Sequence, residues 1–121
     1  MEVMNMTYWE KNDLAKMLTA DRSDLLRELS ADENDAIRCS VASNPNTPKD
    51  ILKELLTDDY SRVRICIIWN PNASREILVM LFAYEKNLKD PNEEVIRALY
   101  LNETLPLFAK RIIETLYGDM L

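Results

Sequence analysis

The stretch Val-Ala-Ser-Asn-Pro-Asn-Thr-Pro-Lys-Asp-Ile-Leu, residues 41–52, returns further along the chain as Ile-Ile-Trp-Asn-Pro-Asn-Ala-Ser-Arg-Glu-Ile-Leu, residues 67–78. The same shift aligns residues 24–29 with residues 50–55, so a whole unit is repeated rather than a short motif. A third copy follows at a larger shift, which places Asp90 on Asp58, and its six extra residues predict a longer helix around residues 82–87. Self-similarity at such a period is typical of proteins built from stacked repeats.

Each unit is predicted to contain two short helices. Thr47, Pro48 and Asp50 have the residue types of an N-cap, a first helical position and an N3 acid, so they predict the start of a first helix. The second helices are predicted to begin at Asp32, Asp58 and Asp90. The positions predicted to face the core are Leu25, Leu26, Leu29, Ile51, Leu52, Leu55, Leu56, Ile77, Leu78, Leu81 and Phe82 in the first helices and Ile37, Ser40, Val41, Val63, Cys66, Ile67, Val95, Ala98 and Leu99 in the second. With a single glycine and few aromatic residues, the composition agrees with an all-α fold.

The Asn-Pro-Asn motif is interpreted as a stop between consecutive helix pairs. The proline that follows Asn44 or Asn70 drives the asparagine out of the helical region and ends the second helix. Asparagine also tolerates the left-handed and turn conformations that could follow. Turn chemistry alone explains each residue of the motif, so we expect no ligand-binding role for it.

The chain is expected to form one domain, because 121 residues can bury one modest core. The ends of a repeat array need caps, since a repeat cannot bury its terminal face alone. An N-terminal cap is predicted over residues 1–20, where Thr7 and Glu10 have the spacing of a capping box. A C-terminal cap is predicted over residues 105–121, with an apolar stripe along its helix. The three repeats between the caps span residues 21–46, 47–72 and 73–104.

The pattern Asp-x5-Arg followed by Val-Ala-Ser-Asn-Pro-Asn-Thr-Pro-x2-Ile-Leu resembles the leucine-rich repeat variant family, which is related in architecture to HEAT and armadillo repeats and is found in bacteria. The resemblance covers roughly residues 20 to 121. It implies a right-handed α-solenoid of short helix pairs, with some 3-10 helices. The period, measured from Asn44 to Asn70, is two residues longer than is usual in the family, and the third unit lacks the proline after Asn102. The cysteine cluster found beside these repeats in some members is absent, so no iron–sulfur role is implied.

HEAT repeats also carry an Asp and an Arg six residues apart that form a ladder between units. Asp32 with Arg38, and Asp58 with Arg64, have this spacing. By analogy we expect a ladder here, which would orient the repeats more than it would stabilise them.

The sequence argues against an enzyme. The chain has no histidine, the commonest general acid-base group, and no Gly-rich loop that could hold a phosphate. Cys39 and Cys66 form no CxxC pair, which favours free thiols in a reducing compartment. We therefore expect no catalytic residue, no metal and no cofactor. No secretory signal and no apolar run of about 20 residues is visible, so a soluble cytoplasmic protein without membrane association is expected.

The second helix of the middle unit carries apolar residues on both of its faces. Ile65, Ile68 and Trp69, together with Tyr100, predict an aromatic and aliphatic patch on the second helices. The predicted rim of this patch consists of Arg38, Arg64 and Arg97. Tryptophan and arginine are enriched at protein–protein hot spots, so the expected function is the binding of a protein partner, or of a second copy as a homodimer.

Two other interpretations stay open. A helix that is apolar all round can simply be covered by its neighbours and the C-terminal cap, without any partner. The net charge of −6 disfavours nucleic-acid binding, since phosphate contacts require Lys and Arg. It agrees instead with a small acidic inhibitor of phage or mobile-element type, which would block a basic protein by presenting carboxylates in place of phosphates.

Overall fold

The computed structural model describes residues 2–121, which contain α-helices, three short 3-10 helices and no strand. The all-α prediction is therefore confirmed for this part of the chain. The elements are η1 (Glu2–Asn5), α1 (Tyr8–Met17), η2 (Ala20–Arg22), α2 (Ser23–Ser30), α3 (Asp35–Ser43), α4 (Lys49–Leu55), α5 (Ser61–Ile68), α6 (Arg75–Lys86), α7 (Glu93–Leu101), α8 (Leu107–Tyr117) and η3 (Gly118–Met120).

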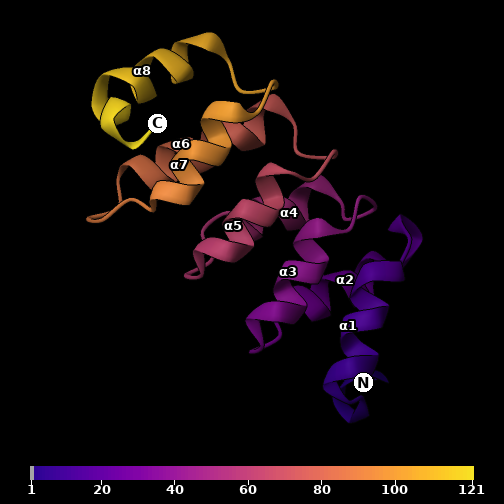
Figure 1. The fold of residues 1–121 in the computed structure, drawn as a ribbon. Coiled ribbons are helices and arrows are strands. Elements are labelled where there is room, and N and C mark those ends of the chain that lie inside the picture. The colour runs from indigo at the N-terminus through magenta and orange to yellow at the C-terminus, as the bar shows by residue number, and fades with distance from the viewer. Residues whose placement is uncertain (1) are drawn as a thin grey trace.

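The helices form two rows. Helices α1, α3, α5 and α7 contact one another in that order, and α2, α4 and α6 do the same on the other side. Figure 1 shows the chain advancing from the indigo N-terminal helices to the yellow α8, with the two termini at opposite ends. The predicted core positions lie buried between the rows, with the exception of Cys66, which is only half-buried. No helix of the described residues is both long enough and apolar enough to span a bilayer.

The second helices begin later than predicted. The residues at the N-cap positions of α3, α5 and α7 are Asn34, Tyr60 and Asn92, not Asp32, Asp58 and Asp90. The carboxylates of Asp32 and Asp58 instead accept the backbone N–H two residues later, at 2.9 and 3.0 Å. An aspartate before a helix can close such a turn as readily as it can cap the helix, so sequence alone placed the start two residues too early.

The predicted start of the N-terminal cap helix and that of the first helix of the second unit had different outcomes. Thr7 and Glu10 form the capping box at α1, with N–H to oxygen distances of 2.9 and 3.2 Å. Thr47 does not cap α4, since its hydroxyl donates to the Val41 carbonyl oxygen at 2.7 Å. The hydroxyl of the buried Thr47 therefore provides a hydrogen-bond donor for a carbonyl at the end of α3 rather than a cap at the start of α4.

The Asn-Pro-Asn motif stops the helix, as predicted from the proline. Helix α3 ends at Ser43, and Asn44 has the extended backbone, with φ −70° and ψ 118°, that a following proline favours. No residue between 2 and 121 has a positive φ, so the left-handed conformation plays no part. The asparagine acts through its side chain instead.

The predicted C-terminal cap packs through a narrow side only. Ala109 and Ile113 of α8 are fully buried against the preceding unit. Ile112 and Tyr117 are half-buried against the core, whereas Phe108 is 60% exposed and Leu116 is 53% exposed.

Candidate partner-binding surface

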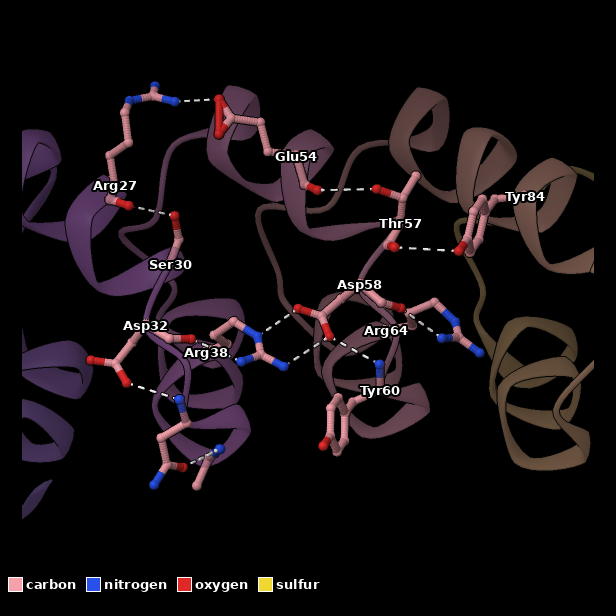
Figure 2. Close-up of polar contacts among 12 residues, drawn as sticks. Arg27, Ser30, Asp32, Arg38, Glu54, Thr57, Asp58, Tyr60, Arg64 and Tyr84 are labelled. Atoms are coloured by element: carbon pink, nitrogen blue, oxygen red, sulfur yellow. Dashed lines mark hydrogen bonds and ion pairs between the residues drawn. The ribbon is translucent and has the colours of Figure 1, made fainter.

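Consecutive units are joined by a row of ion pairs, here called the arginine ladder: Lys11–Asp32, Arg38–Asp58 and Arg64–Glu85. Arg38 Nε lies 2.7 Å from Asp58 Oδ2, and its Nη1 donates to the Asp32 carbonyl oxygen at 2.8 Å. Figure 2 shows Arg38 between these two aspartates and Arg64 on the next rung. The ladder expected from HEAT repeats is therefore present between the first two units, and each arginine also anchors the turn of its own unit.

The last rung uses an acid that the repeat register did not indicate. Arg64 Nε lies 2.7 Å from Glu85 Oε1, and Glu85 Oε2 accepts the Asn92 N–H at 2.8 Å. Asp90, which the register aligns with Asp58, is exposed. The extra residues at the end of α6 extend the helix and place the Glu85 carboxylate where the aspartate of the earlier units would lie.

The ladder removes two arginines from the predicted rim of the patch. Arg64 is 4% exposed, and its guanidinium is bound by Glu85 and by the Asp58 carbonyl. Arg38 is largely covered and bound by Asp58. The prediction that these side chains surround an exposed surface is wrong, because their charges are satisfied between units. Each also lies against a tyrosine ring, Tyr60 for Arg38 and Tyr84 for Arg64.

A second row of contacts, here called the asparagine ladder, consists of Asn44, Asn70 and Asn102. The Asn44 amide donates to the carbonyls of Ala15 and Leu18, both at 2.9 Å. Asn70 donates to the carbonyls of Ala42 and Asn44 in the unit before its own, at 2.7 and 2.9 Å.

The third member keeps this contact although no proline follows it. Asn102 donates to the Ile68 carbonyl at 2.8 Å, and its side-chain oxygen accepts the Thr104 N–H, also at 2.8 Å. These amides complete the carbonyl ends of the odd-numbered helices, which would otherwise lack partners. Helix α5 is thereby held with a defined face toward solvent.

That face of α5 forms a groove with α7. Ile65, Trp69, Ala98 and Leu101 supply its apolar lining, and Glu94 and Arg97 supply its charges, around a volume of about 340 Å³. Trp69 is 55% exposed and Leu101 is 67% exposed. An adjoining hollow of about 260 Å³ is lined by Arg97, Tyr100, Leu101 and Leu121. We call these two hollows together the α5–α7 groove.

The structure brings together four of the seven predicted residues: Ile65, Trp69, Tyr100 and Arg97. Ile68 does not belong with them, since it is 1% exposed and packs in the core. The Tyr100 hydroxyl donates to Glu114 Oε2 at 2.5 Å, which raises the pKa of Tyr100 above its ordinary value. Tyr100 is therefore held by α8 as a wall of the groove.

Sequence reasoning missed Leu101 and Leu121. The alignment of the third unit with the second places Leu101 on Trp69, so Leu101 could have been predicted to lie on the same face as Trp69. Leu121 carries no such signal, because it reaches the groove only through the turn of η3 that follows α8.

A third hollow lies at the turns between helices on the edge of the molecule. It has a volume of about 380 Å³, and its lining includes Asp32, Glu33, Asp58 and Asp59 around Arg38. Glu33 and Asp59 are exposed, whereas Asp32 and Asp58 belong to the arginine ladder. Within residues 2–121 no group of three His, Cys, Asp or Glu side chains is placed to hold a metal ion.

Comparison of the chain with family models, with curated proteins and with solved structures gave no match.

Proposed function

We propose that this protein is a small α-solenoid of the leucine-rich repeat variant type that binds another protein, and that it works without catalysis in the cytoplasm. The observation that carries the proposal is the α5–α7 groove, in which two large apolar side chains, Trp69 and Leu101, remain more than half exposed beside Arg97. Exposed aromatic and aliphatic side chains next to arginine are typical of the anchor regions of protein interfaces.

The two ladders support a binding role because they make the groove a rigid surface rather than a flexible one. They fix α5 and α7 through buried polar contacts, so the groove is formed before a partner arrives. A preformed surface loses less conformational entropy on association than a mobile one does. The partner can be a different protein or a second copy of this chain, and both would place an apolar side chain between Trp69 and Leu101.

The first test is capture by the tagged protein from a lysate of its source cells. The double variant Trp69→Ala, Leu101→Ser should lose the partner, and capture by the parent protein should survive high salt, because an apolar contact is not screened. Trp9→Ala is the matched control, since Trp9 is the chain's other tryptophan and is 72% exposed on α1, away from the groove. Equal capture by all three proteins would exclude the groove.

Self-association is tested on the purified protein. In a Trp9→Phe background, Trp69 is the only tryptophan, so its fluorescence reports directly on the groove. A homodimer through this surface predicts a blue shift of the emission with rising concentration, together with a higher mass in sedimentation equilibrium. If the protein is a monomer and its emission spectrum does not change with concentration, the partner that binds the groove is a different protein.

A second candidate function is supported by the acidic hollow. Glu33 and Asp59 are exposed there, and the chain has a net charge of −6, as expected for a small acidic inhibitor that occupies a basic nucleic-acid-binding surface. The variant Glu33→Gln, Asp59→Asn should then weaken capture, and the parent complex should dissociate in high salt. This outcome is the reverse of the one expected for the groove, so one set of captures separates the two functions.

A further inference from the structure

The chain's two cysteines lie on neighbouring helices, Cys39 on α3 and Cys66 on α5, and these two helices are in direct contact. The repeat indicates which way Cys66 faces. Ser40 occupies the same position one unit earlier, and its hydroxyl donates to Asn12 on the preceding helix of the row. Cys66 should therefore face α3, which carries Cys39, and each of the two thiols shifts the pKa of the other.

The two thiols differ in access. Cys39 is 8% exposed and belongs to the core, whereas Cys66 is half-buried at the edge of the core. Arg62 precedes Cys66 by one helical turn, on the same side of α5, and it is exposed. A small reagent in solvent can therefore reach Cys66 beside a positive charge, while Cys39 is almost completely covered.

The surroundings also separate the two thiols in acidity. The interaction with Cys39 lowers the pKa of Cys66, burial raises it, and the Ser43 hydroxyl and the Arg62 charge lower it further, so that the pKa of Cys66 lies below the ordinary cysteine value. The same interaction, together with burial, raises the pKa of Cys39. Cys66 is thus the more acidic of the two thiols, and Cys39 is the less acidic one. Reaction with electrophiles requires the thiolate, so only the accessible member of the pair is reactive.

We propose that Cys66 and Cys39 form a redox-sensitive dithiol, in which a hydroperoxide oxidises Cys66 and Cys39 then closes a disulfide between α3 and α5. This site is independent of partner binding. In the first step the Cys66 sulfur attacks the peroxide, the O–O bond breaks, Cys66 becomes a sulfenic acid and the alkoxide leaves as an alcohol after taking a proton. In the second step the Cys39 sulfur attacks the Cys66 sulfur, the S–O bond breaks and water leaves with the Cys39 proton. Two thiols and one hydroperoxide thus give one disulfide, one alcohol and one water.

The buried position of Cys39 favours a bridge within one chain. A second molecule cannot bring its own Cys39 to Cys66 without unfolding, whereas the two helices of one molecule already touch. The bridge would close the loop from Cys39 to Cys66, which contains all of α4, and such a constraint should raise the stability of the folded state.

The test uses the full chain and hydrogen peroxide, with intact mass as the readout. The parent protein should lose the mass of two hydrogen atoms and regain it with dithiothreitol, while it remains one chain on a non-reducing gel. Cys39→Ala should stop at the sulfenic acid, which dimedone captures on Cys66. Cys66→Ser should react at least about tenfold more slowly, because the remaining thiol is protonated and buried. Circular dichroism of both variants establishes that they are folded.

The pH dependence of alkylation provides a second readout that a merely structural pair would not show. Modification of Cys66 by iodoacetamide should rise with a midpoint below the ordinary cysteine pKa in the parent. In Cys39→Ala the midpoint should move upward, toward the ordinary cysteine value of about 8.5, because the interaction with Cys39 is gone. An unchanged midpoint, a parent that gains oxygen without losing hydrogen, or covalent dimers through Cys66 would each overturn the proposal.

Discussion

At Asn70 both N–H groups of the side-chain amide donate to carbonyls of the preceding unit, and the side-chain oxygen accepts the Asn72 N–H at 2.7 Å. All of these hydrogen bonds lie within the protein, since Asn70 is 4% exposed. Asparagine supplies two donors and one acceptor on a short side chain, which serine, aspartate and alanine cannot. The residue is therefore required for its amide and not for its backbone freedom.

We predict that Asn70→Ala lowers the free energy of unfolding by at least about 2 kcal/mol, because each buried carbonyl or N–H left without a partner costs about 1 to 3 kcal/mol. Urea denaturation followed by circular dichroism measures the change. Asn46→Ala is the control, since Asn46 is exposed and its side chain makes only a 3.4 Å contact with Leu18. That variant should stay within about 0.5 kcal/mol of the parent. Equal losses in both variants would contradict the asparagine ladder.

The same residue shows what sequence could and could not predict at this scale. Proline after Asn70 correctly predicted the end of α5 in the repeat register, because a pre-proline residue avoids the helical region. The side-chain contacts were not predictable from the motif, since they join Asn70 to Ala42, a residue 28 positions earlier. Local turn rules contain no information about such a partner.

Among the elements, the ion pairs that join an odd-numbered helix to the following unit are buried or partly buried, whereas those between even-numbered helices are exposed. Arg64 and Glu85 bind each other with side chains that are 5% and 0% exposed. Arg27 of α2 binds Asp50 and Glu54 of α4 with all three side chains well exposed. Exposed pairs contribute little to stability, whereas loss of one partner from a buried pair is costly. We therefore expect the orientation of successive helices to depend on the arginine ladder.

Arg64→Met should reduce the free energy of unfolding by about 3 to 5 kcal/mol, since it leaves the Glu85 carboxylate buried without its counter-ion. Chemical denaturation measures the loss. The double variant Arg64→Met, Glu85→Gln should recover part of it, because the amide is neutral and can still accept the Asn92 N–H. If the double variant were less stable than the single one, the buried charge would not be the cause.

The first rung adds a dependence on acid. Burial raises the pKa of Asp32, but the hydrogen bonds from Lys11 and from the Asn34 N–H, with the charges of Lys11 and Arg38, lower it below its ordinary value. A carboxyl whose pKa is lower in the folded state contributes stability that is present above the unfolded pKa of about 4 and is lost as pH falls through the folded pKa.

Lys11→Met should therefore cost about 1 to 2 kcal/mol at pH 7, between the values for exposed and buried pairs, and less below pH 4. Urea titrations at pH 7 and pH 3 measure the two differences. Lys16→Met on the exposed side of α1 should show little change at either pH. A Lys11→Met difference that does not depend on pH would assign the loss to the packing of the lysine stem.

The sequence predicted which types of contact join the helices better than it predicted which residues form them. The six-residue spacing of Asp32 and Arg38 indicated a ladder through resemblance to HEAT repeats, and the contact exists. Glu85 was missed because the insertion in the third unit breaks the register, so that Asp90 aligns with the ladder position but lies outside it. Alignment of the repeats identifies the residues of the ladder only when the helices of the aligned units have equal lengths.

At the scale of the whole molecule, the α5–α7 groove depends on the exposed residue at the end of α5. The exposed Trp69 follows directly after α5, whereas Ile68, its neighbour in sequence, is covered, and its carbonyl oxygen accepts a hydrogen bond from the asparagine ladder. Hydrophobicity alone could not separate these two neighbours, so the predicted patch included both. The alignment of the repeats indicated the face of α5 and α7 on which the groove lies, and tertiary contacts decided which side chains of that face remain exposed.

Because every rung joins a unit only to the one before it, the gene could gain or lose whole units by duplication or deletion without inventing a new contact. Deleting residues 45–70 places Asn44 directly before Pro71 and restores an Asn-Pro-Asn junction, with Arg38 in the place from which Arg64 meets Glu85. We expect this shortened chain to be helical and to melt cooperatively, at a lower temperature because its core is smaller. Deleting residues 45–68 instead displaces the asparagine by two positions, and circular dichroism should show that this chain does not fold. The unit of inheritance in this protein would then be the repeat counted from one asparagine of the ladder to the next.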